Sequence, residues 1–248
     1  PKQQSADSIK REEKIKACLD YWHTTHPSFG VRKLRRLLME HDGIKVGRKL
    51  IRRYMHEMGI YAVYPKPRLS QPDTSPKMPY LLREIDIFLP NQVWAIDITY
   101  IPMKHGHMYV TAIIDWYSRF IVGWSLSDTL DTAPVLDAVK KAISRYGTPA
   151  IINSDQGTQF TSKEYKDYLK EHNIRQSMDG KARWVDNVII ERWFRSLKTE
   201  HVYINEYQNP RELRAGIRDY IDDYKHIRPH QSHGYDTPAM VYGTRFAA

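Results

Sequence analysis

The sequence predicts an α/β protein in which a mixed-sheet domain follows a small all-α domain. Three observations support this division. The basic surplus of the chain lies in its first quarter, prolines are concentrated between residues 61 and 80, and the runs rich in β-branched and aromatic residues come later. We therefore expect a helical domain over residues 8–60, a proline-rich linker over residues 61–88 and an α/β domain over residues 89–248.

The distribution of charge indicates what the helical domain binds. Residues 1–70 carry 16 Lys and Arg against 7 Asp and Glu, a net charge of +9. The remaining 178 residues carry 22 of each sign and are neutral. A surface that is merely rich in lysine would spread its excess more evenly along the chain. The segregation therefore favours a dedicated module for a polyanion, and nucleic acid is the natural candidate.

Three short helices are expected in this module. Apolar residues recur at helical spacing in residues 8–25, 31–41 and 47–59, and a glycine-containing turn joins the last two. This pattern is typical of a helix-turn-helix unit, although a small helical bundle with ordinary solvated charge would give it as well. The candidates for DNA contacts, to phosphates or in a groove, are the four cations of the last helix, Arg48, Lys49, Arg52 and Arg53.

The second domain is expected to hold five strands and four helices. Its first three strands follow one another with short polar turns between them, which indicates an antiparallel meander, and helical crossovers lead into the later strands. The strands are expected at residues 91–102, 107–118, 119–128, 149–155 and 174–179. The helices are expected at residues 129–147, 161–173, 186–201 and 209–227.

Three carboxylates stand out by their positions. Asp97 lies inside an apolar strand, where an acidic side chain is costly without partners or a metal. Asp155 ends a second apolar strand, and Glu191 lies within an otherwise apolar helical face. If the two strands are neighbours, both aspartates stand at one sheet edge, and a following helix can bring Glu191 to them. Taken singly, each is more often a turn, cap or surface residue, and Asp115 could equally be a ligand or organise a turn.

Converging carboxylates repel one another unless divalent cations neutralise them. Mg²⁺ is the ion we expect, with Mn²⁺ able to substitute, because it is hard, prefers oxygen ligands and suits phosphate substrates. Two such ions, about 3.5–4 Å apart, stabilise both the attacking and the leaving oxygen of a phosphoryl displacement. Water is then the nucleophile for hydrolysis, and a DNA 3′-hydroxyl is the nucleophile for strand transfer.

The spacing of these residues resembles a known signature. Asp155 and Glu191 are separated by 35 intervening residues, as in the D-35-E motif of retroviral-integrase-like recombinases. The three carboxylates lie in VWAIDITYI, SDQGTQFTS and SMDGKARWVDNVIIERWFRSLKTE, and HPSFGVRKLRRLL and RPHQSHGYDTPAMVY stand nearer the two ends. Together these segments resemble the second-frame (OrfB) part of bacterial insertion-sequence-three family transposases, over essentially residues 20–243.

The resemblance implies an RNase H-like catalytic core whose catalytic and metal-binding triad is Asp97, Asp155 and Glu191, preceded by a helix-turn-helix domain. It implies a DNA transposase that cuts DNA at insertion-sequence ends and joins strands through a 3′-hydroxyl. Lys198 matches the basic residue expected seven positions after the glutamate, about two helical turns on. With Arg195 it is a candidate for contact with the DNA backbone, and Asn187 is expected to fix the start of the catalytic helix.

The resemblance also sets the expected partners. They are double-stranded DNA, both as element ends and as target, and further copies of the chain, because two DNA ends must be held in a homodimer or a higher multimer. Two other functions stay open, a catalytically silent DNA-binding regulator and a nuclease that cuts without joining. The intact triad argues against the regulator, and the basic module with its linker favours a recombinase over the nuclease.

Cysteine content and hydropathy bound the location. Cys18 is the only cysteine, so no disulfide can form within the chain, and a bacterial cytoplasm is expected, with the protein at the nucleoid. No stretch approaches 18 consecutive apolar residues, so no membrane contact is expected, and no small-molecule substrate is expected either. The sequence begins at Pro1, and we expect it to be part of a longer protein.

Overall fold

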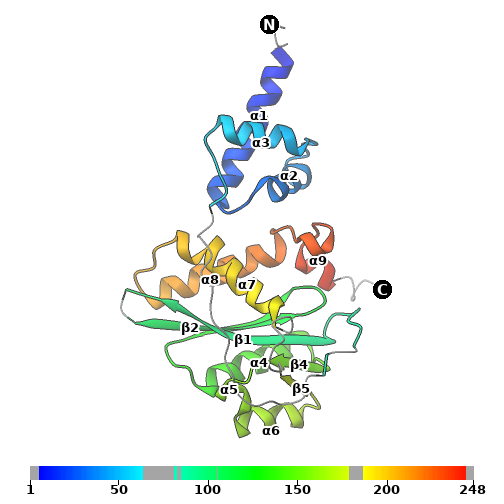
Figure 1. Cartoon of the computed structure of the whole chain (residues 1–248), viewed down its shortest axis with the longest axis vertical. Coiled ribbons are helices and arrows are strands. Elements are labelled where there is room, and N and C mark those ends of the chain that lie inside the picture. The colour runs from blue at the N-terminus through cyan, green and yellow to red at the C-terminus, as the bar shows by residue number, and fades with distance from the viewer. Residues whose placement is uncertain (1–5, 64–80, 83–84, 105, 179–186, 244–248) are drawn as a thin grey trace.

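The computed structural model describes residues 6–63, 81–82, 85–104, 106–178 and 187–243. In this part of the chain a helical domain stands above an α/β domain (Figure 1). The expected order of a helical and then a mixed α/β domain is confirmed. Most of the expected linker, residues 64–80 and 83–84, lies outside the described residues, so its bounds stay a prediction.

The helical domain consists of α1 (Ala6–Thr25), α2 (Val31–Glu40) and α3 (Arg48–Glu57). Its core is built from the apolar positions that the sequence places at helical spacing, among them Leu19, Leu34 and Ile51, none of which is exposed. Gly59 follows α3 with a positive φ of 68°, the left-handed conformation that commonly ends a helix. The three helices expected from the sequence are therefore present, each within about two residues of its expected ends.

The α/β domain contains one five-stranded mixed sheet in the order β3-β2-β1-β4-β5. Its first three strands are antiparallel, whereas β4 runs parallel to β1 and β5 runs parallel to β4. The strands are β1 (Val93–Pro102), β2 (His107–Asp115), β3 (Ile121–Ser127), β4 (Ile151–Ser154) and β5 (Arg175–Met178). The antiparallel meander with later crossovers is thus confirmed.

Helices cover both faces of this sheet (Figure 1). On one face lie α4 (Thr132–Tyr146), α5 (Thr158–Thr161) and α6 (Lys163–Glu171), and on the other α7 (Val188–Glu200) and α8 (Pro210–His226). Four short elements were not expected from the sequence: α5, η1 (Val202–Ile204), η2 (Gln231–His233) and α9 (Pro238–Gly243). These elements span three to six residues, too few to show a helical period.

Side chains of β1 alternate between the two layers. Trp94 and Ile96 pack with α4 and α6, while Ala95 packs with α7 and α8. Because successive strand side chains point to opposite faces, Asp97 belongs to the face that α7 covers. Its strand therefore presents the carboxylate toward the helix that carries Glu191.

The two domains contact one another through α2 on one side and through α7 and residues 227 and 236 on the other. Lys33 Nζ lies 2.7 Å from Glu200 Oε1, at the C-terminal end of α7. Arg36 Nη2 lies 3.0 Å from Asp236 Oδ1, and Ile227 packs against the helical core. These contacts join residues about 170 to 200 positions apart in the sequence, and the Lys33–Glu200 pair ties α7 directly to the N-terminal domain.

Candidate active site

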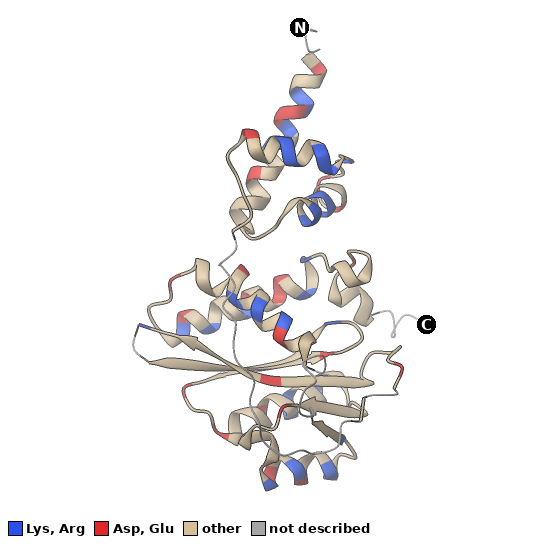
Figure 2. Cartoon of the chain, in the orientation of Figure 1, with Lys and Arg blue, Asp and Glu red and all other residues tan. Residues whose placement is uncertain are grey.

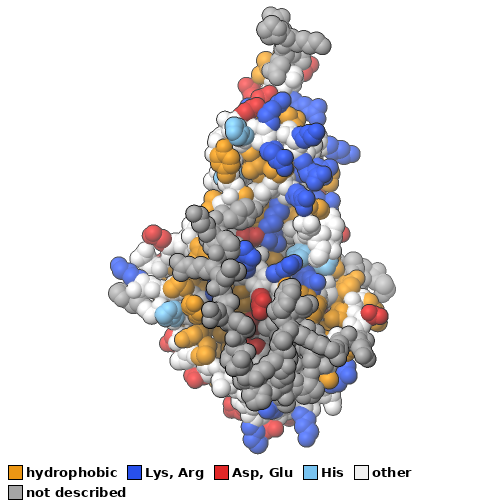
Figure 3. All heavy atoms as spheres, viewed as in Figure 1, with side chains coloured by type: hydrophobic (Ala, Val, Ile, Leu, Met, Phe, Trp, Pro, Cys, Tyr) orange, Lys and Arg blue, Asp and Glu red, His pale blue; other side chains and the backbone are white. Residues whose placement is uncertain are grey.

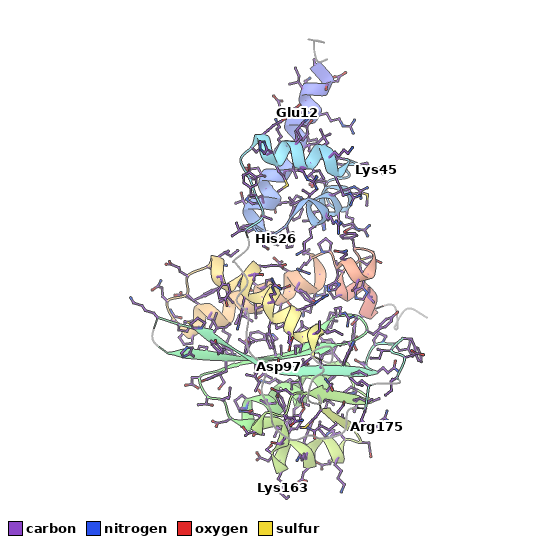
Figure 4. All side chains as sticks on the ribbon, in the orientation of Figure 1. Glu12, His26, Lys45, Asp97, Lys163 and Arg175 are labelled. Atoms are coloured by element: carbon purple, nitrogen blue, oxygen red, sulfur yellow. The ribbon has the colours of Figure 1, made fainter. Side chains whose placement is uncertain are left out.

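Asp97 and Asp155 are brought to the same place by the parallel pairing of β1 and β4. Ala95 pairs with Asn153, and continuing that register by two residues sets Asp97 level with Asp155. Both line one cavity of about 420 Å³ at the carboxyl end of β4. Figure 4 shows Asp97 on the central strand, between the two helical layers. Two of the three candidate carboxylates therefore share one cavity.

The backbone after β4 holds Asp155 in place. Gly157 N donates a hydrogen bond to Asp155 Oδ1 at 2.9 Å. A Cβ at position 157 would stand 3.0 Å from the same oxygen and 3.1 Å from Gln159 Oε1, so any larger residue would push against the carboxylate in this position. On the neighbouring strand, Ile98 N donates to Asp97 Oδ1 at 2.7 Å.

Glu191 lies in the first turn of α7 and is exposed, whereas its neighbours Ile190 and Phe194 are buried. The sequence predicts that Glu191 lies within an apolar helical face, and this prediction is wrong. The apolar side chains of α7 face the sheet, whereas Glu191 faces away from them. It does not line the cavity of Asp97 and Asp155. Within the described ranges, no three His, Cys, Asp or Glu side chains are grouped closely enough to hold a metal ion. Glu191 as third ligand stays a prediction.

Lys198 stands beside the cavity, two turns further along α7. Its Nζ lies 4.8 Å from the ring centre of Tyr100, which itself lines the cavity. Burial lowers the pKa of Lys198, and the carboxylate of Asp97 opposes that shift. Tyr100 was not expected at the site from the sequence. Its only signal is a large aromatic side chain at an exposed strand position, 58% accessible in the structure.

Asn187 occupies the N-cap position of α7, but its side chain makes no capping hydrogen bond. Only its backbone oxygen acts there, accepting a bond from Glu191 N at 3.0 Å. Its Oδ1 is buried and has no partner among the described residues. Any role at the start of the helix therefore rests on the backbone of Asn187.

Asp115 organises a turn. It is fully buried and accepts hydrogen bonds from Asn91 N at 2.7 Å, Ser118 N at 2.8 Å and Ser118 Oγ at 2.6 Å. Burial raises its pKa, and these donors oppose that shift. The sequence left two roles open for Asp115, ligand or turn residue, and these hydrogen bonds support the turn residue.

The other candidate residues for DNA contacts are accessible. Arg48, Lys49, Arg52 and Arg53 are all exposed on α3, and Arg195 is exposed on α7. Arg53 forms an ion pair of 3.3 Å with Glu57. Figure 2 shows Lys and Arg on α2 and α3 of the helical domain and on α7 of the α/β domain.

Residues 89–183 and 172–238 each match a family model described as Integrase core domain, and residues 10–68 match one described as HTH-like domain. Solved structures agree on the fold. The HTLV-2 integrase catalytic core domain in complex with magnesium aligns with a TM-score of 0.53 at 22% identity, covering 62% of this chain and 97% of that one. A chain of the simian T-cell lymphotropic virus intasome aligns with a TM-score of 0.56 at 18% identity, covering 84% and 70%. The class is therefore an integrase catalytic core joined to a helix-turn-helix-like domain.

Curated relatives place the chain within that class. It is 32% identical over 244 residues to the transposase for insertion sequence element IS904 of Lactococcus lactis, covering 94% of this chain and 95% of that protein. It is 37% identical over 161 residues to transposase InsF for insertion sequence IS3A of Escherichia coli, covering 64% and 56%. The chain belongs to the IS3 family of insertion-sequence transposases. None of the described helices is long and apolar enough to span a membrane.

Proposed function

We propose that the chain cuts DNA at the ends of an insertion sequence and joins the resulting 3′-hydroxyl to another strand. The observation that carries this proposal is the shared cavity of Asp97 and Asp155, which lies on the integrase-type sheet beside a basic side chain, Lys198. Family membership supports the same chemistry. Phosphoryl transfer needs the negative charge on the substrate to be offset and the reacting oxygens to be aligned. A pair of carboxylates that can bind cations, with a lysine beside it, can meet both needs.

Asp97 and Asp155 would hold Mg²⁺, or Mn²⁺ in its place, because their carboxylate oxygens are the hard ligands that these ions prefer. We assign the third ligand to Glu191, since α7 packs on β1 and its first turn carries that residue. Two such ions, when bound, would stabilise the attacking and leaving oxygens of the transfer.

The remaining roles fall to residues that this chain provides around the carboxylates. Lys198 would bind a phosphate of the strand next to the cut, and Gly157 would keep Asp155 correctly oriented. The α3 cations Arg48, Lys49, Arg52 and Arg53, together with Arg195, would bind double-stranded DNA at the element ends and the target. Because two ends must be held together, the active species would be a homodimer or a higher multimer.

A strand-transfer assay tests the proposal. Labelled duplexes that carry the ends of the parent insertion sequence would be incubated with the protein and Mg²⁺. We expect joined products, and a loss of about 100-fold or more in Asp97→Asn, Asp155→Asn and Glu191→Gln. Asp128→Asn is the matched control, because Asp128 also follows a strand and is exposed but lies outside the cavity.

The products distinguish the competing functions. DNA binding with neither cutting nor joining, in wild type and variants alike, would identify a regulator. Cutting without joining would identify a nuclease. Wild-type activity in the Glu191→Gln variant alone would remove Glu191 from the site while leaving the aspartate pair in place.

A further inference from the structure

A cationic cavity of about 560 Å³ lies between the two domains. Its lining comes from α2 of the helical domain, from α7, and from the segments around residues 119 and 228–235. No acidic residue lines it, while six cations do: Arg32, Lys33, Arg119, Arg192, Arg195 and Arg228. This volume is within the range of cavities that bind ligands of nucleotide size.

Part of this positive charge is neutralised within the protein. Glu200 pairs with Lys33 and Arg228, which are therefore structural cations. Within the described part of the chain, Arg32, Arg192 and Arg195 have no carboxylate within ion-pair distance. Arg119 donates to the backbone oxygen of Trp116. A set of cations without counterions at one cavity creates a field that attracts an anion.

Two residues that line the cavity have an unfavourable backbone conformation. Arg119 has a φ of 64° and Tyr235 a φ of 79°, in the left-handed region that favours glycine. Among the described residues other than glycine, the only others with positive φ are Asn91 and Asn173, and asparagine tolerates this region. Backbone strain of this kind clusters at binding and active sites, so these two residues mark the cavity as a candidate site.

The cavity lies next to candidate DNA-contact residues of both domains. A second hollow, of about 470 Å³, shares Arg32 and Tyr235 with it and reaches Arg48 at the start of α3. On the other side, Arg195 and Lys198 lie one and two helical turns beyond Glu191 on α7. Figure 3 shows blue side chains running from the helical domain down to the junction with the α/β domain.

We propose that this interdomain cavity binds backbone phosphates of the DNA strand that runs from the helix-turn-helix domain to the Asp97–Asp155 pair. Guanidinium groups bind phosphate oxygens in a bidentate manner, and arginines from both domains line the cavity. The indole N–H of Trp193, another lining residue, has no acceptor among the described residues. DNA in the cavity would fix the distance between the bound end and the cut. This inference rests on the proposed function and extends it.

The salt dependence of DNA binding tests this inference. The probe is a labelled duplex of about 40 bp of arbitrary sequence, titrated at several salt concentrations. Each phosphate contact contributes about 0.9 to the slope of log K against log salt, so the double variant Arg32→Gln, Arg192→Gln should lower the slope by about 1.8. The double variant Lys170→Gln, Arg211→Gln removes two exposed cations outside the cavity and should keep the wild-type slope.

A second variant tests whether weaker DNA binding could result from misfolding. Asparagine tolerates the left-handed backbone at position 119, so Arg119→Asn should keep the melting temperature within a few degrees while weakening DNA binding about tenfold. If wild type binds DNA and both cavity variants keep its slope and affinity, the inference is overturned. Thermal stabilisation by inorganic tripolyphosphate, with an unchanged DNA slope, would overturn it in favour of a free anion. If wild type itself binds no DNA, the proposed function fails first.

Discussion

The two ends of α7 carry the same residue in opposite environments. Glu200, at the C-terminal end, has a side chain that is only 8% exposed, and it accepts bonds from Arg228 Nε at 2.7 Å, Arg228 Nη2 at 2.6 Å and Lys33 Nζ at 2.7 Å. Glu191, at the N-terminal end, is exposed and has no side-chain partner within the described ranges. One glutamate therefore has its charge fully compensated, and the other does not.

The pKa values of the two carboxyls differ in line with this difference in compensation. Burial acts to raise the pKa of Glu200, but Arg228 and Lys33 outweigh it and lower the pKa to about 2. Desolvation raises the pKa of Glu191, and no cation offsets it. A compensated carboxylate of this kind ties the two domains together, whereas an exposed carboxylate without a cationic partner stays free to bind an external cation. One helix thus carries a structural glutamate at one end and the proposed third metal ligand at the other.

Replacing each glutamate in turn gives the largest expected contrast. Glu200→Ala leaves Arg228 buried without its counterion, which should reduce the free energy of unfolding by about 3–5 kcal/mol. Glu191→Ala, the matched change on the same helix, should cost less than about 1 kcal/mol because the residue is exposed. Guanidinium unfolding measured by circular dichroism would test both. If Glu200→Ala lost as little unfolding free energy as we expect for Glu191→Ala, the Glu200 cluster would not stabilise the fold.

Acid should disrupt the same cluster. The folded-state pKa of Glu200 is about 2 and its ordinary value is 4.5. A depressed carboxyl pKa contributes stability that is fully present above the unfolded value and is lost as pH falls through the folded one. We therefore expect up to about 3 kcal/mol to be lost between pH 4.5 and 2.

Urea unfolding at a series of pH values would measure that loss. Glu200→Gln provides the control, because an amide at this position cannot titrate. The variant should start from a lower stability and show a flatter acid limb. An acid limb as steep in the variant as in wild type would assign the effect to other carboxyls.

Much of this architecture follows from local sequence patterns. The strands of the meander and the long helices each have a clear hydrophobic period, so their order and approximate ends are predictable. Asp97 and Asp155 are predictable too. Burying a carboxylate in or just after an apolar strand costs free energy unless it has a partner or a metal, so such a residue is a candidate for function. Their meeting depends only on β1 and β4 being parallel neighbours, which the crossover rule favours.

What the sequence could not reveal depends on contacts between distant residues. Lys33 and Glu200 are 167 positions apart, and neither differs locally from a surface charge. The direction of Glu191 depends on how α7 rotates on the sheet, which is decided by its packing against β1 and α8. The positive φ values of Arg119 and Tyr235 also arise from loops whose paths are fixed by tertiary contacts. Local periodicity contains none of this information.

The smallest change that we expect to separate catalysis from stability is Gly157→Ala. The backbone at this position has a φ of −56°, which alanine adopts without strain, so the melting temperature should change little. The new Cβ would stand 3.0 Å from Asp155 Oδ1, however, and must displace that carboxylate by some tenths of an ångström. Misplacement on this scale should slow strand transfer about tenfold and raise the Mg²⁺ concentration needed for half-maximal rate.

Gly243→Ala is the matched control, because nothing lies within 4 Å of a Cβ built there. It should leave both the rate and the Mg²⁺ dependence unchanged. If Gly157→Ala slows the reaction while excess Mg²⁺ restores the rate, Asp155 acts by holding the ion, as we propose. A wild-type rate at all Mg²⁺ concentrations would mean that the orientation set by Gly157 does not matter, and the contrast between compensated and catalytic carboxylates would then rest on Glu191 and Glu200 alone.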